Sequence, residues 1–210
     1  MKLGLITDIH ESTEHLRTAL SHFEAEKVDQ IVQIGDLFEL GQRIEETCQL
    51  LRDAKVIGVW GNHDFGLCIN PAPDMRKKHG DVVIEYMTSL QPRIEVAGCY
   101  FAHVEPWLNP EELMDLWFFD GPPNDSSRLE RIFNAVPNRL MFGGHYHRWL
   151  LVSPGGISEW DGECPISLTP GRFFVVIGAL CEGSYAILDT DSSELVPFNL
   201  SSDGQQVNSI

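Results

Sequence analysis

The stretch LGLITDIH (residues 3–10) joins an apolar run with strand character to an aspartate and a histidine two positions apart. In an extended segment alternate side chains point to the same side, so Asp8 and His10 can face one ligand. Carboxylates and imidazoles are side chains that hold divalent transition metals in proteins. The stretch therefore predicts a strand whose carboxyl end carries part of a metal site.

The same arrangement recurs along the chain. Strand-like runs at 31–34, 56–60, 99–102 and 140–142 are each followed by polar residues that can bind metals. These residues are Gly35-Asp36, Gly61-Asn62-His63-Asp64, His103 and Gly144-His145-Tyr146-His147. Ligands of open α/β sheets bind beyond the carboxyl ends of the strands, so the clusters are expected to meet in one place. Together they predict a hydrolase with two metal ions in its active site.

Three segments have the apolar spacing of a helix with one buried face. Apolar residues recur at i, i+3, i+4 and i+7 in residues 16–23, 44–51 and 129–136. With the runs above, the first half reads strand–helix–strand–helix–strand, which is typical of a parallel sheet with covering helices. Ser127 and Glu130 have the spacing of a capping box and predict the start of the third helix.

The pattern changes from residue 148 onward. Short strand-like runs at 149–152, 157–160, 173–177, 185–188 and 195–198 are separated by Gly, Pro, Asp and Ser. They predict antiparallel hairpins that form or extend a second sheet. We expect one domain over residues 1–200 and a polar, frayed tail over 201–210.

Composition bounds the possible partners and location. The longest apolar run, 173–181, is too short to span a bilayer, and the first ten residues leave no room for a signal peptide. Five cysteines with no Cys-x-x-Cys pair indicate reduced thiols, so a cytoplasmic protein without a membrane partner is expected. The formal net charge of −16 leaves little for a basic stripe, so no duplex nucleic acid is expected as a partner. Small phosphate anions stay possible, because two divalent ions would reverse the charge locally.

The order Asp-x-His, Gly-Asp, Gly-Asn-His-Asp, His, Gly-His-x-His resembles the calcineurin-like metallophosphoesterase superfamily from Asp8 to His147. The resemblance implies an α/β fold: a four-layer α/β/β/α sandwich of two mixed β-sheets flanked by helices. It also implies a ligand set. One metal would be held by Asp8, His10, Asp36 and His147, and the other by Asp36, Asn62, His103 and His145. Asp36 would bridge the two ions, and His63 would face the substrate, paired with Asp64.

The resemblance also implies a reaction. Two divalent ions, Mn²⁺ first and Fe, Zn or Ni as alternatives, would support attack of a metal-bridging hydroxide on a phosphate ester. The expected substrate is a phosphodiester or a small-molecule or nucleotide phosphomonoester. Ser/Thr protein phosphatases of this superfamily carry two phosphate-gripping arginines where this chain has Leu40 and Trp60. The missing arginines make a protein phosphatase or a dinucleoside-tetraphosphate hydrolase the second alternative instead of the first. A non-catalytic interaction scaffold is the third.

Some aromatic residues leave alternatives open. His79 competes with His103 as a ligand, but it lies in a polar segment, where a solvated surface position is expected. His15 and His22 fall outside the apolar set of their helix and are expected to be exposed. The segment Trp107–Pro123 could cover the substrate. A helix over 111–118 with its aromatic side chains in the core is the favoured alternative.

Overall fold

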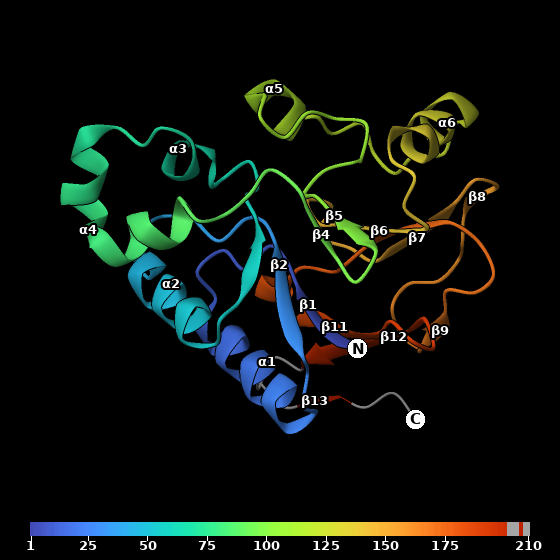
Figure 1. Cartoon of the computed structure of the whole chain (residues 1–210), viewed down its shortest axis with the longest axis horizontal. Coiled ribbons are helices and arrows are strands. Elements are labelled where there is room, and N and C mark those ends of the chain that lie inside the picture. Colours follow the sequence, from blue (N-terminus) through green and yellow to red (C-terminus); the bar gives the residue numbers. More distant parts are fainter. Residues whose placement is uncertain (201–205, 208–210) are drawn as a thin grey trace.

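The computed structural model describes residues 1–200 and 206–207 and contains two mixed β-sheets (Figure 1). The first sheet has the strand order β13-β12-β11-β1-β2-β3, with β9 pairing β12. Its strands are β1 (Lys2–Ile6), β2 (Gln30–Ile34), β3 (Ile57–Val59), β9 (Ile166–Ser167), β11 (Ser184–Asp189), β12 (Glu194–Leu200) and β13 (Gln206–Val207). As the sequence predicts, β1, β2 and β3 are parallel.

The second sheet has the order β4-β5-β6-β10-β7-β8. Its strands are β4 (Ile94–Val96), β5 (Cys99–Phe101), β6 (Leu140–Gly143), β7 (Leu150–Ser153), β8 (Gly156–Ile157) and β10 (Phe173–Val176). The late strands were expected to form or extend a second sheet, and β7, β8 and β10 do so. Strands β11 and β12 instead extend the first sheet, because β11 pairs antiparallel with β1. The strand predicted over 157–160 is shorter than expected and ends at Ile157.

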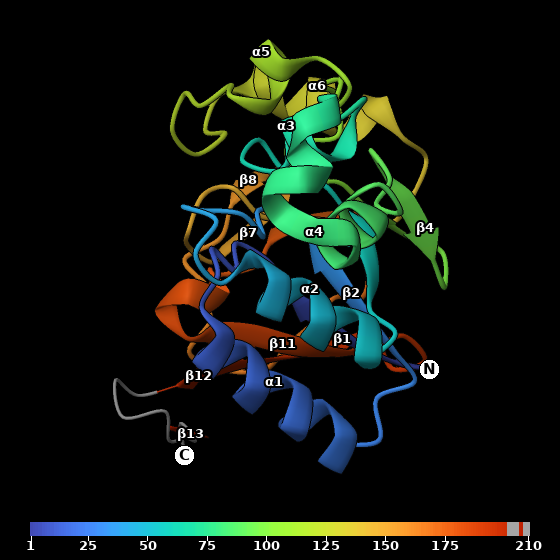
Figure 2. The same ribbon diagram turned by 90° about the vertical axis from the view of Figure 1, so that its left-hand side faces the viewer.

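Helices cover the outer faces of both sheets, which gives four layers (Figures 1 and 2). The first sheet is covered by α1 (Thr13–Ala25), α2 (Ile44–Asp53) and α4 (Pro73–Met87), with the short α3 (Phe65–Cys68) beside them. The second sheet is covered by α6 (Ser126–Ala135), and α5 (Leu113–Leu116) and the 3₁₀ turn η1 (Leu180–Glu182) lie in connections. None of the helices in the described ranges has both the length and the apolar character needed to span a membrane.

The alternation of strand side chains explains the layers. Leu3 and Leu5 of β1 point into the core between the two sheets, whereas Ile6 packs with the helices on the outer face. Phe101 and Phe142 meet Leu3 and Leu5 from the other sheet, and their rings stack with centroids 5.2 Å apart. A period of two residues is therefore enough to build an apolar layer on each side of a strand.

One local expectation is wrong, one helix was missed, and one predicted segment lies largely outside the described residues. The third predicted helix is α6, but Asp125 caps it by accepting a hydrogen bond from the Arg128 backbone amide at 2.9 Å, so Ser127 is not the cap. Helix α4 is absent from the sequence prediction, because its apolar residues gather in its second half and Gly80, with φ of 85°, interrupts it. The predicted tail 201–210 is described only at Gln206–Val207.

Candidate metal centre

The predicted ligands follow the carboxyl ends of strands in both sheets. Asp8, Asp36 and Asn62 follow β1, β2 and β3 of the first sheet. His103 follows β5, and His145 and His147 follow β6, both in the second sheet. The structure therefore brings residues from two sheets to one place, as the sequence pattern predicts.

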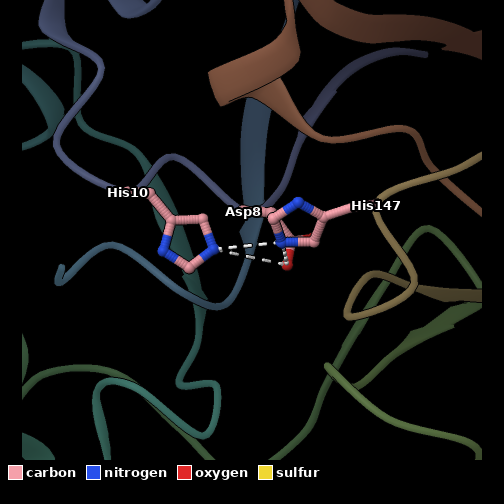
Figure 3. A group of neighbouring side chains, drawn as sticks. All are labelled: Asp8, His10 and His147. Carbon is pink, nitrogen blue, oxygen red and sulfur yellow. Dashed lines mark hydrogen bonds and ion pairs between the residues drawn. The ribbon is translucent and has the colours of Figure 1, made fainter.

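Asp8, His10 and His147 form the first ligand group (Figure 3). Asp8 is fully buried, and its Oδ1 atom has no hydrogen-bond partner. That oxygen lies 3.3 Å from His147 Nε2 and 3.9 Å from His10 Nε2. The two Nε2 atoms are themselves 3.1 Å apart. Three side-chain atoms, one from each residue, thus converge on one point without a protein group to satisfy them all.

The other ring nitrogens show why a cation fits the first ligand group. His10 Nδ1 lies 2.9 Å from Glu39 Oε2, and His147 Nδ1 lies 3.4 Å from Glu182 Oε1. Each Nδ1 lies near a carboxylate, although His10 Nδ1 makes no hydrogen bond to the described residues, and the two Nε2 atoms point at each other. Such a contact requires a proton or a cation between the two nitrogens. Neutral imidazoles oriented by carboxylates are the usual form of histidine metal ligands.

Asp36, Asn62, His103 and His145 form the second ligand group. His103 Nε2 lies 3.2 Å from Asp36 Oδ2 and 3.1 Å from Asn62 Oδ1, and His145 Nδ1 lies 3.0 Å from Asn62 Oδ1. Asp36 Oδ2 is also 3.9 Å from His10 Nε2, so this carboxylate lies between the two groups. The predicted bridging position of Asp36 is thus consistent with the geometry.

Backbone carbonyls orient the histidines of the second ligand group. His103 Nδ1 donates to the Ile34 carbonyl at 2.7 Å, and His145 Nε2 donates to the Phe118 carbonyl at 3.2 Å. Each ring therefore has a hydrogen on the side away from the ligand group, and its other nitrogen would present a lone pair to a bound metal. The oxygen and imidazole donors of both groups suit Mn²⁺, Fe and Zn.

The electrostatics of the centre couple its histidines to its carboxylates. The hydrogen bond to Asp8 raises the pKa of His147 to about 11. Burial lowers the pKa of His103, but the charge of Asp36 outweighs it and raises that pKa to about 9. Burial opposes ionisation of Asp36, yet His103 and His63 hold its pKa well below the ordinary value. Burial lowers the pKa of His145 to about 4, so this imidazole is neutral at pH 7.

The backbone at the strand ends is left-handed at several site residues. Positive φ angles of 50°, 43°, 57°, 71° and 51° occur at Asp8, His10, Asp36, His145 and His147. This conformation is uncommon for residues other than glycine and concentrates at functional sites. It turns the side chains of the loops toward one another instead of along the strand direction.

The glycines that precede ligands are needed for close approach, as the sequence predicts. A Cβ atom at Gly144 would lie 2.6 Å from Asp8 Oδ2, and one at Gly61 would lie 2.7 Å from the Asp36 backbone nitrogen. Gly35 combines a φ of 97° with contact to the His103 ring. Side chains at these positions would displace the ligands.

A profile of the calcineurin-like phosphoesterase superfamily domain matches residues 1–193, the range that contains both ligand groups. The chain belongs to this superfamily. A relative, an uncharacterized protein of Methanocaldococcus jannaschii, is 26% identical in an alignment that covers 89% of this chain and 82% of that protein.

Solved structures share the fold of this calcineurin-like phosphoesterase. A metallophosphoesterase from Sphaerobacter thermophilus superimposes with a TM-score of 0.76 at 23% identity, covering 99% of this chain and 88% of that one. An archaeal phosphodiesterase superimposes with a TM-score of 0.53 at 20% identity, covering 95% of this chain and 100% of that one. The predicted arrangement of two mixed sheets flanked by helices is therefore confirmed.

The expected pairing of His63 with Asp64 is not found in this family member. Asp64 is fully buried, and its carboxylate accepts backbone amides of Leu37 at 2.9 Å, Phe38 at 3.0 Å and Gly61 at 3.0 Å. It ties the loop after β2 to the loop after β3, and burial followed by the charge of Asp36 raises its pKa to about 6. Its carboxylate is thus engaged by backbone amides and not by His63.

Glu39 is the carboxylate near His63 that the sequence prediction missed. Its Oε2 lies 3.8 Å from His63 Nδ1 and 2.9 Å from His10 Nδ1. The loop that carries it is held by Glu11, which accepts the backbone amides of Glu39, Gly41 and Arg43 at 2.5 to 3.0 Å. The sequence signal that could have indicated Glu39 was its position three residues after the predicted ligand Asp36.

Other expectations about aromatic residues are corrected. His79 is buried against Phe38, so it is not a solvated surface residue; it belongs to α4, which the sequence did not reveal. His15 and His22 are half-buried, and His15 contacts the Leu180 carbonyl at 2.9 Å. The segment 107–123 contains only a short helix, α5, and Trp117 is half exposed instead of lying in the core.

Proposed function

We propose that this chain is a phosphoesterase that uses two divalent metal ions to hydrolyse phosphodiesters or small-molecule or nucleotide phosphomonoesters. The observation that carries the proposal is the convergence of the two ligand groups on either side of Asp36. Superfamily membership supports hydrolysis of phosphate esters as the reaction class. The mixed carboxylate, amide and imidazole donors support Mn²⁺ as the first metal to test, with Fe and Zn next.

Two bound ions would supply charge to hold the phosphoryl oxygens and to activate water for in-line attack. The chain's own residues fix where that happens. Asp8 Oδ2 is held by the Thr7 hydroxyl at 2.7 Å and the His145 amide at 3.0 Å, which leaves Oδ1 directed at the first ligand group. A ligand set oriented in this way binds metal without reorganising at the moment of reaction.

His63 would hold the proton for the leaving oxygen. Its backbone amide donates to Asp36 Oδ1 at 3.0 Å, so the loop that carries it is tied to the centre. Its ring lies edge-on to His10, with centroids 4.9 Å apart, and its side chain is about one third exposed. Glu39, 3.8 Å from Nδ1, would orient the ring so that Nε2 faces the substrate.

The surroundings favour diesters or small esters over phosphoproteins. Leu40 is exposed, and Trp60 is buried with its indole nitrogen donating to the Pro110 carbonyl at 2.8 Å. Neither side chain can form the bidentate hydrogen bonds by which an arginine binds a dianionic phosphate. The complete ligand set argues against a non-catalytic scaffold. A cytoplasmic location and the absence of nucleic-acid and membrane partners stay predictions.

The test is an activity screen of metal-free protein supplied with Mn²⁺, comparing bis-p-nitrophenyl phosphate, p-nitrophenyl phosphate and a nucleotide panel. We expect metal-dependent hydrolysis that Asp36→Asn abolishes, because Asp36 belongs to both ligand sites. Asp74→Asn, an exposed aspartate at the start of α4, is the matched control. Absence of hydrolysis with every metal and ester, together with no metal binding by calorimetry, would disprove the proposal.

A further inference from the structure

Exposed apolar side chains gather in one short segment near the metal centre. Leu113, Met114, Trp117 and Phe119 are 43%, 81%, 52% and 60% exposed, and they account for four of the seven large exposed apolar side chains among the described residues. Large apolar groups clustered on a surface usually mark a binding site. Trp117 and Phe119, which we name the aromatic rim, carry the inference.

The segment between the two rim residues is firmly anchored. Phe118 packs edge-on against Trp107, with ring centroids 5.3 Å apart, and the Arg128 guanidinium lies 5.3 Å from its ring centroid. Its carbonyl accepts the hydrogen bond from His145, and the neighbouring Asp120 carbonyl accepts one from Arg128 at 2.8 Å. The chain is therefore fixed at its middle, and side chains on either side of Phe118 project outward at set positions.

The anchor itself is a buried ion pair. Arg128 and Glu105 lie 2.5 Å apart, both nearly without solvent exposure, and the Tyr146 hydroxyl bonds to both. Tyr146 stands between His145 and His147, so the network joins the rim segment to the two histidines of the centre. A rim joined in this way to the ligands is held at a fixed position relative to the centre.

Each rim residue lies beside a histidine of the centre. The Trp117 ring lies 5.3 Å from the His63 ring, tilted by 43°. The Phe119 ring lies 6.0 Å from the His145 ring and 5.5 Å from that of Tyr146. Trp117 is thus next to the proposed proton donor, on the side from which the leaving group departs.

We propose that the aromatic rim is a subsite for a nucleobase, so that the preferred substrates are nucleotide esters whose base stacks on Trp117. The inference rests on the proposed function, since it names the leaving group of that reaction. An indole face stacks on any base, because every base presents a π surface. Stacking needs no positive charge, which suits a chain with a net charge of −16.

The experiment compares esters that differ only in the base. Adenosine 5′-phosphate and ribose 5-phosphate share the same leaving oxygen, and their methyl diesters serve if the screen finds a diesterase. We expect kcat/KM to favour the adenosine ester, and Trp117→Ala to reduce that preference by about 5- to 150-fold, mainly through KM. Trp117→Phe should retain most of the preference, because a phenyl face still stacks.

Met114→Ala is the control, since it removes the most exposed apolar side chain of the segment without removing a ring. A thermal melt checks that each variant is folded. Equal kcat/KM for both esters, or a preference that Trp117→Ala leaves intact, would overturn the nucleobase subsite while the phosphoesterase proposal stands. Failure to hydrolyse either ester or any ester of the panel would instead remove the proposed function and the subsite with it.

Discussion

His63 differs from the other histidines of the centre in what surrounds it. The histidines of both ligand groups direct ring nitrogens at other members of their group. His63 instead lies beside the rings of His10 and Trp117 and stays partly exposed. A side chain in that position can reach a substrate oxygen without giving up a metal. Its role is therefore separable from metal binding by substitution.

We expect His63→Gln to keep both metal ions and to lower kcat by roughly 10²–10⁴-fold for an ester with a leaving group of high pKa, the usual size of lost acid catalysis. The loss should be much smaller for p-nitrophenolate, which departs without a proton. Metal content by mass spectrometry and kcat across a leaving-group series are the measurements. His22→Gln, on α1 away from the ligand groups, is the control. An equal loss for all leaving groups would contradict proton donation.

Metal binding should release protons, because the carboxylates hold the histidines in their charged form. The pKa of His147 is raised to about 11 and that of His103 to about 9, so both bind a proton at pH 7.5 in the absence of metal. A metal needs the lone pair that the proton occupies. Affinity should therefore rise with pH through about 9, where His103 loses its proton, and continue to rise toward about 11, where His147 does.

Calorimetric titration of Mn²⁺ at pH 7.5, in two buffers with different ionisation enthalpies, measures this release. We expect each chain to release roughly one to two protons when it binds its metal ions, since two imidazoles must deprotonate. Identical heats in both buffers would show that the histidines are already neutral. Asp8→Asn should lower the release, because Asp8 is the main cause of the raised pKa of His147.

At the scale of the elements, the strands and their following loops were readable from the sequence and the contacts between loops were not. Apolar runs followed by ligand residues identified five strand ends to within one residue, because each signal is local. Glu39 and Asp64 show the limit of such local signals. Both are carboxylates near Asp36 and His63 in sequence, and only the folded backbone decides that Asp64 binds amides and Glu39 faces the imidazoles.

Helix α4 shows a second limit. Its buried residues Val83, Ile84 and Met87 lie in its last two turns, whereas its first half is polar and contains Gly80. In the sequence, an apolar stripe that short cannot be distinguished from a loop. His79 is buried because the folded chain packs it against Phe38, a contact that the local sequence does not indicate. For Trp117 and Phe119 the sequence leaves two alternatives, and the less favoured one, a segment that covers the substrate, agrees better with their exposure. The core is favoured by the sequence because a run of aromatic residues normally indicates one.

The cap of α6 gives a prediction at this scale. Asp125 accepts the Arg128 amide, while Ser127 lies inside the first turn and is exposed. Asp125→Ala should therefore lower the free energy of unfolding by about 1 kcal/mol, the usual cost of a lost N-cap. Ser127→Ala should change it by less than about 0.5 kcal/mol, as expected of an exposed helical position. Urea denaturation of both variants decides between the two caps, and a larger effect for Ser127→Ala would restore the capping box.

At the scale of the whole molecule, the metal centre is where the two sheets meet. Asp8, Asp36 and Asn62 come from the first sheet, and His103 and His145 come from the second. Each ligand group therefore contains residues of both sheets: Asp8 with His147 in the first, and Asp36 with His103 in the second. Ions bound there would link the sheets at one edge, in addition to the apolar layer between them.

We expect metal to stabilise the folded chain because the unfolded chain cannot assemble ligands that lie up to 139 positions apart, from Asp8 to His147. At a free metal concentration a hundred times the dissociation constant, binding adds about 2.7 kcal/mol to the free energy of unfolding. For a chain of this size that corresponds to a rise in Tm of roughly 5–11 °C. Differential scanning calorimetry of chelator-treated protein with and without Mn²⁺ measures it. Asp36→Asn should lose most of the rise while Asp74→Asn keeps it, and an unchanged Tm at saturating Mn²⁺ would mean that the two groups do not bind the ion across the sheets.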